Sequence, residues 1–270
     1  MLTASLVLYH NSMCDVDTII NCVLKSPIDK LYIIDNSRND SFRILEKRSD
    51  KIRYIHNENI GYGGAHNIAI RDAINIGAKY HIVVNPDIYF EIGAIVSLIE
   101  YMDDNPDVGW VMPKVVYPDG DLQYLCKPLP SPVDLFLRRF VPRALLKKRI
   151  EKFELRNFSY DRELNVPFLS GCFMFLRVSA LQDIGLFDER FFMYGEDIDL
   201  SRRMHSLYKT MFYPNATIVH AHAAESYKSR KMLFVHIKNI VKYFNKWGWF
   251  FDKKRHEINK KLLKDLYYYN

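Results

Sequence analysis

The sequence predicts an α/β protein with a mostly parallel central sheet flanked by helices. Strand-like and helical segments alternate through the first half of the chain, which is typical of βα units. The run Ile82-Val83-Val84 consists of β-branched residues and suits a strand that is covered on both faces. Polar loops follow the strands at the edge where open α/β sheets bind ligands. We therefore expect any ligand site at the carboxyl ends of the strands.

Each element of the first half is predicted from its hydrophobic period and from the turn residues beside it. Short runs rich in β-branched residues indicate strands, and longer segments with apolar residues at helical spacing indicate helices. In chain order we expect strands at 2–10, 30–37, 51–57, 81–85 and 108–117, and helices at 15–25, 64–77 and 91–102. This half is therefore predicted to form a series of βα units.

The second half is less regular. Pro and Gly dominate 117–132, and Leu and Phe alternate with Arg and Lys in the basic segment 133–153. Beyond it we expect a strand at 166–177, helices at 178–185 and 196–208, and a late strand at 211–220. In the tail, Phe234, Ile237, Val241 and Phe244 fall at helical spacing and predict a helix packed on the rest of the protein.

Composition places the chain among ordinary globular proteins. It has 270 residues, 49% hydrophobic and 26% charged, and a net charge of +6 with basic residues crowded toward the C-terminal half. No nucleic-acid recognition motif accompanies these residues, so nucleic acid is not an expected partner. The four cysteines lack metal-type pairing and predict free thiols in a reducing cytosol. The first residues read as a strand rather than as a signal peptide or a membrane span.

Three loops at the predicted ligand edge carry polar residues: Asp35-Asn36-Ser37, Asn57 to Asn67, and Asn85-Pro86-Asp87. The glycines of the second loop allow close backbone approach at a helix start, and Pro86 ends its strand because it cannot donate to a ladder. Asp, Asn and Gly are also common turn residues, so each loop alone is equally compatible with a turn. Three such loops on one edge favour a site.

A further acidic cluster opens the helix at 196–208. Asp199 is predicted to pair with Arg203 four residues later, which is a structural role. Glu196 and Asp197 are not explained in that way. A carboxylate at a helix N-terminus that faces a cleft can act as a general base.

These stretches together resemble glycosyltransferase family 2, and within it the bacterial rhamnosyltransferase-like branch. The resemblance covers about residues 3 to 226 and rests on four motifs in the family's order: NENIGYGGAHN, VVNPDI, SGCFMFLRVSALQDIGLFDERFFMYGEDIDLSRR and YPNATIVHAHAAES. It implies a Rossmann-like GT-A fold over 1–226, with a nucleotide-sugar half at 1–117 and an acceptor and base half at 118–226. Residues 227–270 are then a basic, aromatic helical extension.

The resemblance also implies a role for each matching residue. Asp35 and Asn36 correspond to the positions that contact the pyrimidine base. Asp87 corresponds to the last residue of the DxD metal motif, in which Asn85 replaces the first Asp, and His220 to a second metal ligand. Asp197 corresponds to the catalytic base, with Glu196 as the reserve candidate. The remaining residues expected to bind the donor are Tyr9, Asn59, Gly61, Gly63, Gly64, Asn67 and Asn85.

The implied reaction is an inverting sugar transfer. Mg²⁺ or Mn²⁺ would stabilise the departing diphosphate, and one or two protein carboxylates suffice for such an ion, so a reduced DxD is compatible with activity. The expected donor is dTDP-L-rhamnose, with UDP-galactofuranose, UDP-glucose and UDP-GlcNAc as alternatives. The expected acceptor is a glycan on a polyprenyl diphosphate, in the synthesis of a bacterial surface polysaccharide such as O-antigen or capsule.

The tail suggests where the protein works. Its aromatic residues adjoin basic ones and suit an anionic membrane surface, as does the segment from Leu135 to Phe153. The aromatic residues concerned are Trp247, Trp249, Phe250 and Phe251, and the basic ones are Lys253, Lys254 and Arg255. We expect a cytoplasmic protein peripheral on the inner face of the plasma membrane. The same aromatic residues would suit a second subunit, so a homodimer stays open.

Two other classes of protein are alternatives for this sequence. Sugar nucleotidyltransferases share the sheet architecture, but they carry a Gly-rich, basic phosphate loop after the first strand, and the segment from Leu6 to Asp17 has none. A binding module that has lost catalysis is the non-enzyme alternative. The presence of both Asp87 and Asp197 favours an enzyme.

Overall fold

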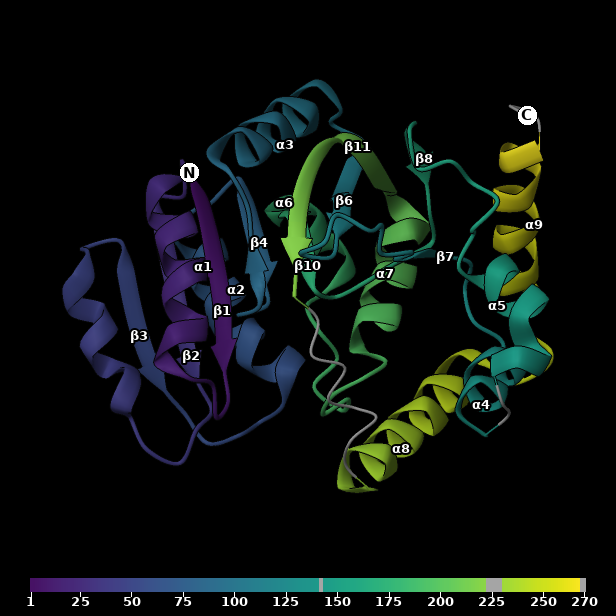
Figure 1. Cartoon of the computed structure of the whole chain (residues 1–270), viewed down its shortest axis with the longest axis horizontal. Coiled ribbons are helices and arrows are strands. Elements are labelled where there is room, and N and C mark those ends of the chain that lie inside the picture. The colour runs from purple at the N-terminus through teal and green to yellow at the C-terminus, as the bar shows by residue number, and fades with distance from the viewer. Residues whose placement is uncertain (141–142, 222–229, 268–270) are drawn as a thin grey trace.

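The structure, a computed structural model, describes residues 1–140, 143–221 and 230–267 (Figure 1). It confirms a mixed α/β fold with a central, mostly parallel sheet flanked by helices. The predicted boundary between 226 and 227 lies outside the described residues, as does the end of the last matching motif beyond Ala221. Within the described part, no helix is both long and apolar enough to cross a membrane.

The central sheet has nine strands among the described residues, in the order β3-β2-β1-β4-β10-β6-β11-β5, with β8 paired to β11. Neighbours from β3 to β4 are parallel, and so are β6 and β11, whereas β10, β5 and β8 join antiparallel. The strands are β1 (Leu2–Leu8), β2 (Lys30–Asp35), β3 (Ile52–His56), β4 (Tyr80–Val84), β5 (Ile88–Tyr89), β6 (Val108–Val116), β8 (Leu164–Asn165), β10 (Phe173–Arg177) and β11 (Lys209–His220).

Helices pack against this sheet. α2 contacts β1 and β2, and both α3 and α7 contact β6 and β11. The helices are α1 (Met13–Lys25), η1 (Ser41–Arg48), α2 (Tyr62–Asn75), α3 (Ile92–Asp104), α4 (Pro132–Phe140), η2 (Arg143–Leu146), α5 (Lys147–Phe153), α6 (Val178–Ile184), α7 (Glu196–Leu207), α8 (Arg230–Trp247) and α9 (Lys253–Tyr267). A small two-stranded sheet joins β7 (Cys126–Lys127) to β9 (Phe168–Leu169).

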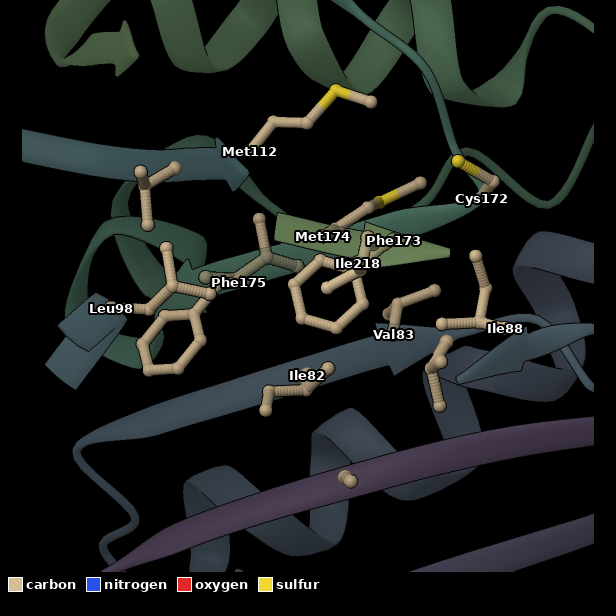
Figure 2. Packing of buried hydrophobic residues seen from close by; sticks show 14 of the residues in the cluster. Ile82, Val83, Ile88, Leu98, Met112, Cys172, Phe173, Met174, Phe175 and Ile218 are labelled. Atoms are coloured by element: carbon tan, nitrogen blue, oxygen red, sulfur yellow. The ribbon is translucent and has the colours of Figure 1, made fainter. Parts of the chain in front are cut away.

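Strand β10 holds the middle of the sheet together. Its Phe173 lies opposite Val84 of β4, and its Phe175 lies opposite both Ile82 of β4 and Val111 of β6. All five side chains are at most 1% exposed, in agreement with a strand covered on both faces. Figure 2 shows this packing, in which Phe173 and Phe175 lie over Ile82 and Val83. The core therefore continues without a break from the first half of the chain into the second.

Three details differ from the sequence-based expectation. The segment predicted as one strand at 166–177 forms β9 and β10, which are separated by a turn at Gly171-Cys172. The irregular segment 117–132 contains β7, and the short strands β5 and β8 had not been predicted. These strands are two residues long, too short for their alternation to be read from sequence.

The C-terminal extension packs through a face that matches the predicted one only in part, since Phe244 is buried as expected. Phe234 is 69% exposed, whereas Ile240, Tyr243 and Phe244 of α8 are buried in a second apolar cluster that also includes Phe191 and Ile198. Trp247 and Trp249, which were expected to suit a membrane surface, pack partly buried against this cluster. α8 lies on the side of the molecule toward which β4 and β11 point (Figure 1).

Candidate functional site

The first polar loop is built on the end of β2. Asp35 is fully buried, and its carboxylate accepts hydrogen bonds from the Tyr54 hydroxyl at 2.7 Å and the Ser37 backbone N–H at 2.9 Å. Asn36 is 4% exposed and donates through Nδ2 to the Gly61 carbonyl at 3.4 Å. Its Oδ1 has no hydrogen-bond partner within the described part of the chain. The loop thus presents a buried oxygen, Asn36 Oδ1, that can accept a hydrogen bond from a ligand.

The second loop is shaped by contact with the segment 187–192. Gly61 has φ +86°, which favours glycine, and a Cβ there would lie 2.2 Å from the carbonyl oxygen of Phe192. Asn59 accepts from the Gly61 N–H at 3.1 Å. A Cβ on Gly63 would lie 2.8 Å from Cβ of Phe187. Gly64 is buried in the same turn of α2. These glycines allow the start of α2 to pack closely on that segment.

Asn67 fastens the same two segments with its side-chain amide. Its Nδ2 donates to the Phe187 carbonyl and to Glu189 Oε1, both at 2.9 Å, and its Oδ1 accepts from the Phe187 N–H at 3.0 Å. The residue is 1% exposed. All of its hydrogen-bonding groups are therefore engaged within the protein, and Asn67 positions the loop that precedes Glu196.

Asp87 and His220 meet at the carboxyl edge of the sheet. His220 Nε2 lies 3.3 Å from Asp87 Oδ2, and its Nδ1 lies 2.9 Å from Gln123 Oε1. Gln123 also donates to the His220 carbonyl at 2.7 Å, which fixes the position of the residue. Burial lowers the pKa of His220, but the Asp87 carboxylate and the Cys172 thiol outweigh it and raise the pKa to about 10.

Tyr62 joins this edge to the predicted base. Its hydroxyl donates to Gly171 O at 2.7 Å and lies 3.0 Å from Asn85 Oδ1, and the Gly171 N–H donates to Asp197 Oδ2 at 3.2 Å. The loops that hold Asn85, Gly171 and Asp197 are therefore neighbours. Sequence reasoning missed Tyr62, and the signal available was an aromatic residue between glycines at a helix start.

The Tyr62 ring packs against a buried row of hydrogen-bonded side chains. The tyrosine ring packs edge-on against His66 at 4.4 Å. The Ser5 hydroxyl lies 2.7 Å from Nδ1 of His66 and 2.8 Å from Nε2 of His81. Ser5, His66 and His81 are all fully buried, and burial lowers the pKa of both imidazoles. Both rings are therefore neutral and act as hydrogen-bonding supports.

Glu196 and Asp197 begin α7. Asp197 also accepts from the Ile198 N–H at 2.8 Å, and burial raises its pKa. Glu196 is 5% exposed, and its Oε2 has no hydrogen-bond partner within the described residues. Burial first, and the Asp197 charge second, raise the pKa of Glu196 to about 8. Burial thus makes both carboxyl groups weaker acids than carboxyl groups in water.

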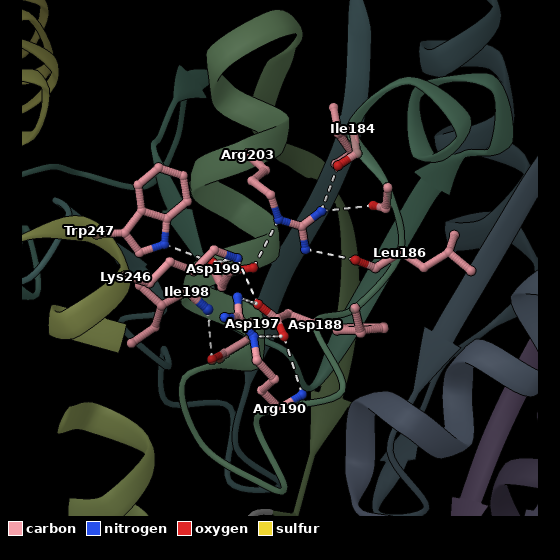
Figure 3. Close-up of polar contacts among 12 residues, drawn as sticks. Ile184, Leu186, Asp188, Arg190, Asp197, Ile198, Asp199, Arg203, Lys246 and Trp247 are labelled. Carbon is pink, nitrogen blue, oxygen red and sulfur yellow. Dashed lines mark hydrogen bonds and ion pairs between the residues drawn. The ribbon is translucent and has the colours of Figure 1, made fainter. Parts of the chain in front are cut away.

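Asp199 belongs to the scaffold of α7, as predicted. Its Oδ2 accepts from Arg203 Nε at 2.9 Å, and its Oδ1 accepts from Trp247 Nε1 and Lys246 Nζ, each at 2.7 Å. Lys246 also reaches Asp188 at 2.8 Å (Figure 3). The start of α7 is thus fixed from both sides, by its own helix and by α8.

A second ion pair joins α7 to the extension. Arg202 binds both oxygens of Asp252 at 2.6 and 2.8 Å, and its guanidinium lies 4.2 Å from the Trp247 ring centroid. Both charged side chains are 4% exposed.

Tyr9 is 49% exposed just beyond β1, and its backbone N–H donates to Asn11 Oδ1 at 2.9 Å. The structure therefore leaves the Tyr9 ring at the rim of the edge.

The residues present fit a divalent cation only in part. Among the described residues, no group of three His, Cys, Asp or Glu side chains is placed to hold a metal ion. Asp87 and His220 supply two donors of the right chemistry once the imidazole has released its Nε2 proton, and Gln123 orients the ring as a supporting residue does in metal sites. Two protein donors suffice where diphosphate oxygens and water complete the coordination of Mg²⁺.

Comparison with known families decides to which family the chain belongs. The sequence model of glycosyl transferase family 2 matches residues 6–185, well over half of the chain. The chain belongs to glycosyl transferase family 2. Among curated relatives, the N-acetylglucosaminyl-diphospho-decaprenol L-rhamnosyltransferase of Mycobacterium tuberculosis is 27% identical over 226 residues, covering 77% of this chain and 70% of the relative.

Solved glycosyltransferases share the fold of this family 2 member at low sequence identity. GalNAc-T7 in complex with UDP, GalNAc and Mn²⁺ aligns with a TM-score of 0.62 at 12% identity, over 89% of this chain and 47% of that one. The mannosyltransferase PcManGT of Pyrobaculum calidifontis, in complex with GDP-Man and Mn²⁺, aligns with a TM-score of 0.57 at 15% identity, over 89% and 64%. The chain thus spans about half the length of GalNAc-T7. These likenesses establish the GT-A fold.

Proposed function

We propose that this family 2 member transfers L-rhamnose from dTDP-L-rhamnose to a hydroxyl group of a lipid-linked glycan, with inversion at the anomeric carbon. The observation that carries the proposal is the bridge made by Tyr62. Its hydroxyl lies beside Asn85, two residues before Asp87, and donates to the Gly171 carbonyl, while the Gly171 N–H donates to Asp197. The name of the mycobacterial relative supports the choice of L-rhamnose and of a prenyl-diphosphate-linked acceptor.

In the proposed reaction, Asp197 takes the proton of the acceptor hydroxyl. The acceptor oxygen forms a bond to C1 of the sugar while the bond from C1 to the diphosphate oxygen breaks, and dTDP leaves. Asp197 suits this role because burial raises its pKa, which makes it a stronger base than a carboxylate in water. The first turn of α7 presents it, and Lys246 and Arg203 hold that turn through Asp199.

Asp87 and His220 would hold Mg²⁺ or Mn²⁺ together with the diphosphate, and such an ion supplies Lewis-acid stabilisation of the leaving group. The chain's own residues bind the remainder of the donor. The unpartnered Oδ1 of Asn36 offers an acceptor to the N3–H of a pyrimidine, and the Asp35 carboxylate is held in place beside it by Tyr54 and Ser37. Both dTDP and UDP carry this donor group, so the UDP-sugars remain the alternative.

The deciding experiment combines calorimetry with a transfer assay. dTDP, UDP and GDP are titrated into the protein with and without Mn²⁺, and Asp87→Ala serves as the metal-site variant. We expect Mn²⁺-dependent binding of dTDP above the others, which is lost in the variant. Asp197→Asn should bind the donor normally yet transfer about 10²- to 10⁴-fold more slowly.

Two results would contradict the proposal. Binding of none of the three nucleotides would favour a non-catalytic module on a GT-A scaffold. Transfer by Asp197→Asn at the parent rate would remove the proposed base and make Glu196 the next candidate.

Because the proposed acceptor is lipid-linked, we propose that the protein works on the cytoplasmic face of a bacterial plasma membrane, in surface polysaccharide synthesis.

A further inference from the structure

Two phenylalanines protrude from the turn between α8 and α9. Phe250 is 69% exposed and Phe251 is completely exposed, although both follow directly on a cluster of packed aromatic residues. Single exposed apolar residues are common on proteins. Two consecutive exposed rings in one turn form an apolar projection, which is typical of an interaction surface. We call residues 248–252 the Phe250 turn.

The Phe250 turn is held rigidly. On one side, Trp247 Nε1 donates to Asp199 of α7, and on the other, Asp252 forms the buried ion pair with Arg202 of the same helix. Trp249 points inward and stacks on Phe136 of α4, with ring centroids 6.2 Å apart and an interplanar angle of 11°. The two tryptophans thus anchor the turn, while the two phenylalanines are left outside it.

Positive charge lies beside this projection, on α9. Between residues 230 and 267 there are eleven Lys and Arg residues against three Asp and Glu residues, although the whole chain has 38 against 32. The excess charge of the protein therefore lies in the extension. Lys253, with a side chain that is 91% exposed, and the exposed Lys254 come immediately after the turn. Three further exposed lysines follow on α9: Lys260, Lys261 and Lys264.

We propose that the Phe250 turn inserts into the headgroup region of an anionic lipid bilayer, with the α9 lysines binding the lipid phosphates. Exposed aromatic side chains bordered by lysines match the chemistry of such an interface, where rings enter the acyl boundary and cations remain at the headgroups. The inference rests on the proposed function, in which the acceptor is anchored in a bilayer. Because α7 carries Asp197 and also binds both ends of the turn, insertion would fix the distance between the membrane and the base.

The test measures binding of the full chain to vesicles of phosphatidylcholine with and without phosphatidylglycerol. The parent should bind only the anionic vesicles, and added salt should weaken binding. Phe250→Ser/Phe251→Ser should weaken it about tenfold for each ring removed. Ile44→Ser is the matched control, since Ile44 is 54% exposed on η1 at the opposite end of the molecule, beside β3 (Figure 1). It should bind as the parent does.

Vesicle binding requires no sugar, metal ion or turnover, so it is independent of whether the proposed reaction is correct. On a water-soluble acceptor without a prenyl chain, the double Phe variant should keep the parent rate. Equal vesicle binding by the parent and the double Phe variant would overturn the proposal. So would a dimer in sedimentation that Phe250→Ser/Phe251→Ser dissociates in the absence of lipid, because the turn would then be a subunit interface.

Discussion

Replacing Asp252 by alanine should weaken the attachment of the C-terminal extension to α7. Arg202 would lose both of its hydrogen bonds to Asp252, at 2.6 and 2.8 Å, and would remain buried with a side chain that is 4% exposed. Removing one partner of a buried ion pair leaves an uncompensated charge and costs about 3–5 kcal/mol. The Trp247 ring over Arg202 cannot replace a carboxylate. We therefore expect a fall of about that size in the free energy that holds α8 and α9 in place.

Tryptophan fluorescence can follow this loss. The chain has three tryptophans, of which Trp110 is buried in β6 while Trp247 and Trp249 lie in the extension. In a Trp110→Phe background, urea titration by fluorescence reports on the extension, and circular dichroism reports on the whole fold. Asp252→Ala should shift the fluorescence transition to lower urea by more than it shifts the dichroism.

Two variants control the experiment. Lys253→Ala removes a neighbouring charge that is 91% exposed, and it should change stability by less than about 0.5 kcal/mol. Arg202→Met/Asp252→Leu replaces the pair by apolar residues and should recover most of the loss. Burial raises the pKa of Asp252, but hydrogen bonds from Arg202 lower it overall, so its stabilising contribution is present above the ordinary carboxyl pKa and is lost as the pH falls below it. If Asp252→Ala behaved like Lys253→Ala, the reasoning would be refuted.

Two more predictions concern the site itself. Gly61→Ala should lower stability by at least about 2 kcal/mol and weaken nucleotide binding in calorimetry, because its Cβ would overlap the Phe192 carbonyl at a φ of +86°; unchanged binding would show that the loop is not part of the donor site. For Glu196, burial raises the pKa from 4.5 to about 8, so the folded, metal-free protein holds a proton that the unfolded chain releases. Its stabilising contribution is therefore complete below pH 4.5 and declines as the pH rises toward 8, and Glu196→Gln should flatten the pH dependence of the urea midpoint over that range; an unaltered slope would count against it.

Local rules predicted much of the first half of the chain and part of the site. The β-branched run at 82–84 is buried as expected, and Asp199 binds Arg203 because residues four apart on a helix face one another. The proximity of Asp87 and His220 followed from the matched motifs, and the structure brings them to 3.3 Å. These features depend on neighbours in the chain or on a motif of known order.

The missed features depend on contacts between distant segments. Asn67 binds residues about 120 positions away, and Arg202 binds Asp252 across 50 positions, with no local pattern to indicate either partner. For the tail, the helical period and the burial of Phe244 are as predicted, but Phe234 is exposed, because apolar residues at 240 and 243 compete with those at 234, 237 and 241 for the buried side. A helical period alone cannot choose between two such stripes.

The central place of β10 has a consequence for how this protein is made. During synthesis, β1 to β4 and β6 leave the ribosome before β10. Strand β10 must later fit between β4 and β6, where it pairs with Val84 and Val111. Until roughly 60 more residues have followed β6, two apolar strand edges stay open, and open edges of this kind pair readily with other chains. The nascent protein therefore passes through a period in which it is prone to aggregate, and chaperone binding in that interval would protect it. Once β10 is in place, the two halves of the chain share one sheet, and neither can be released without breaking it.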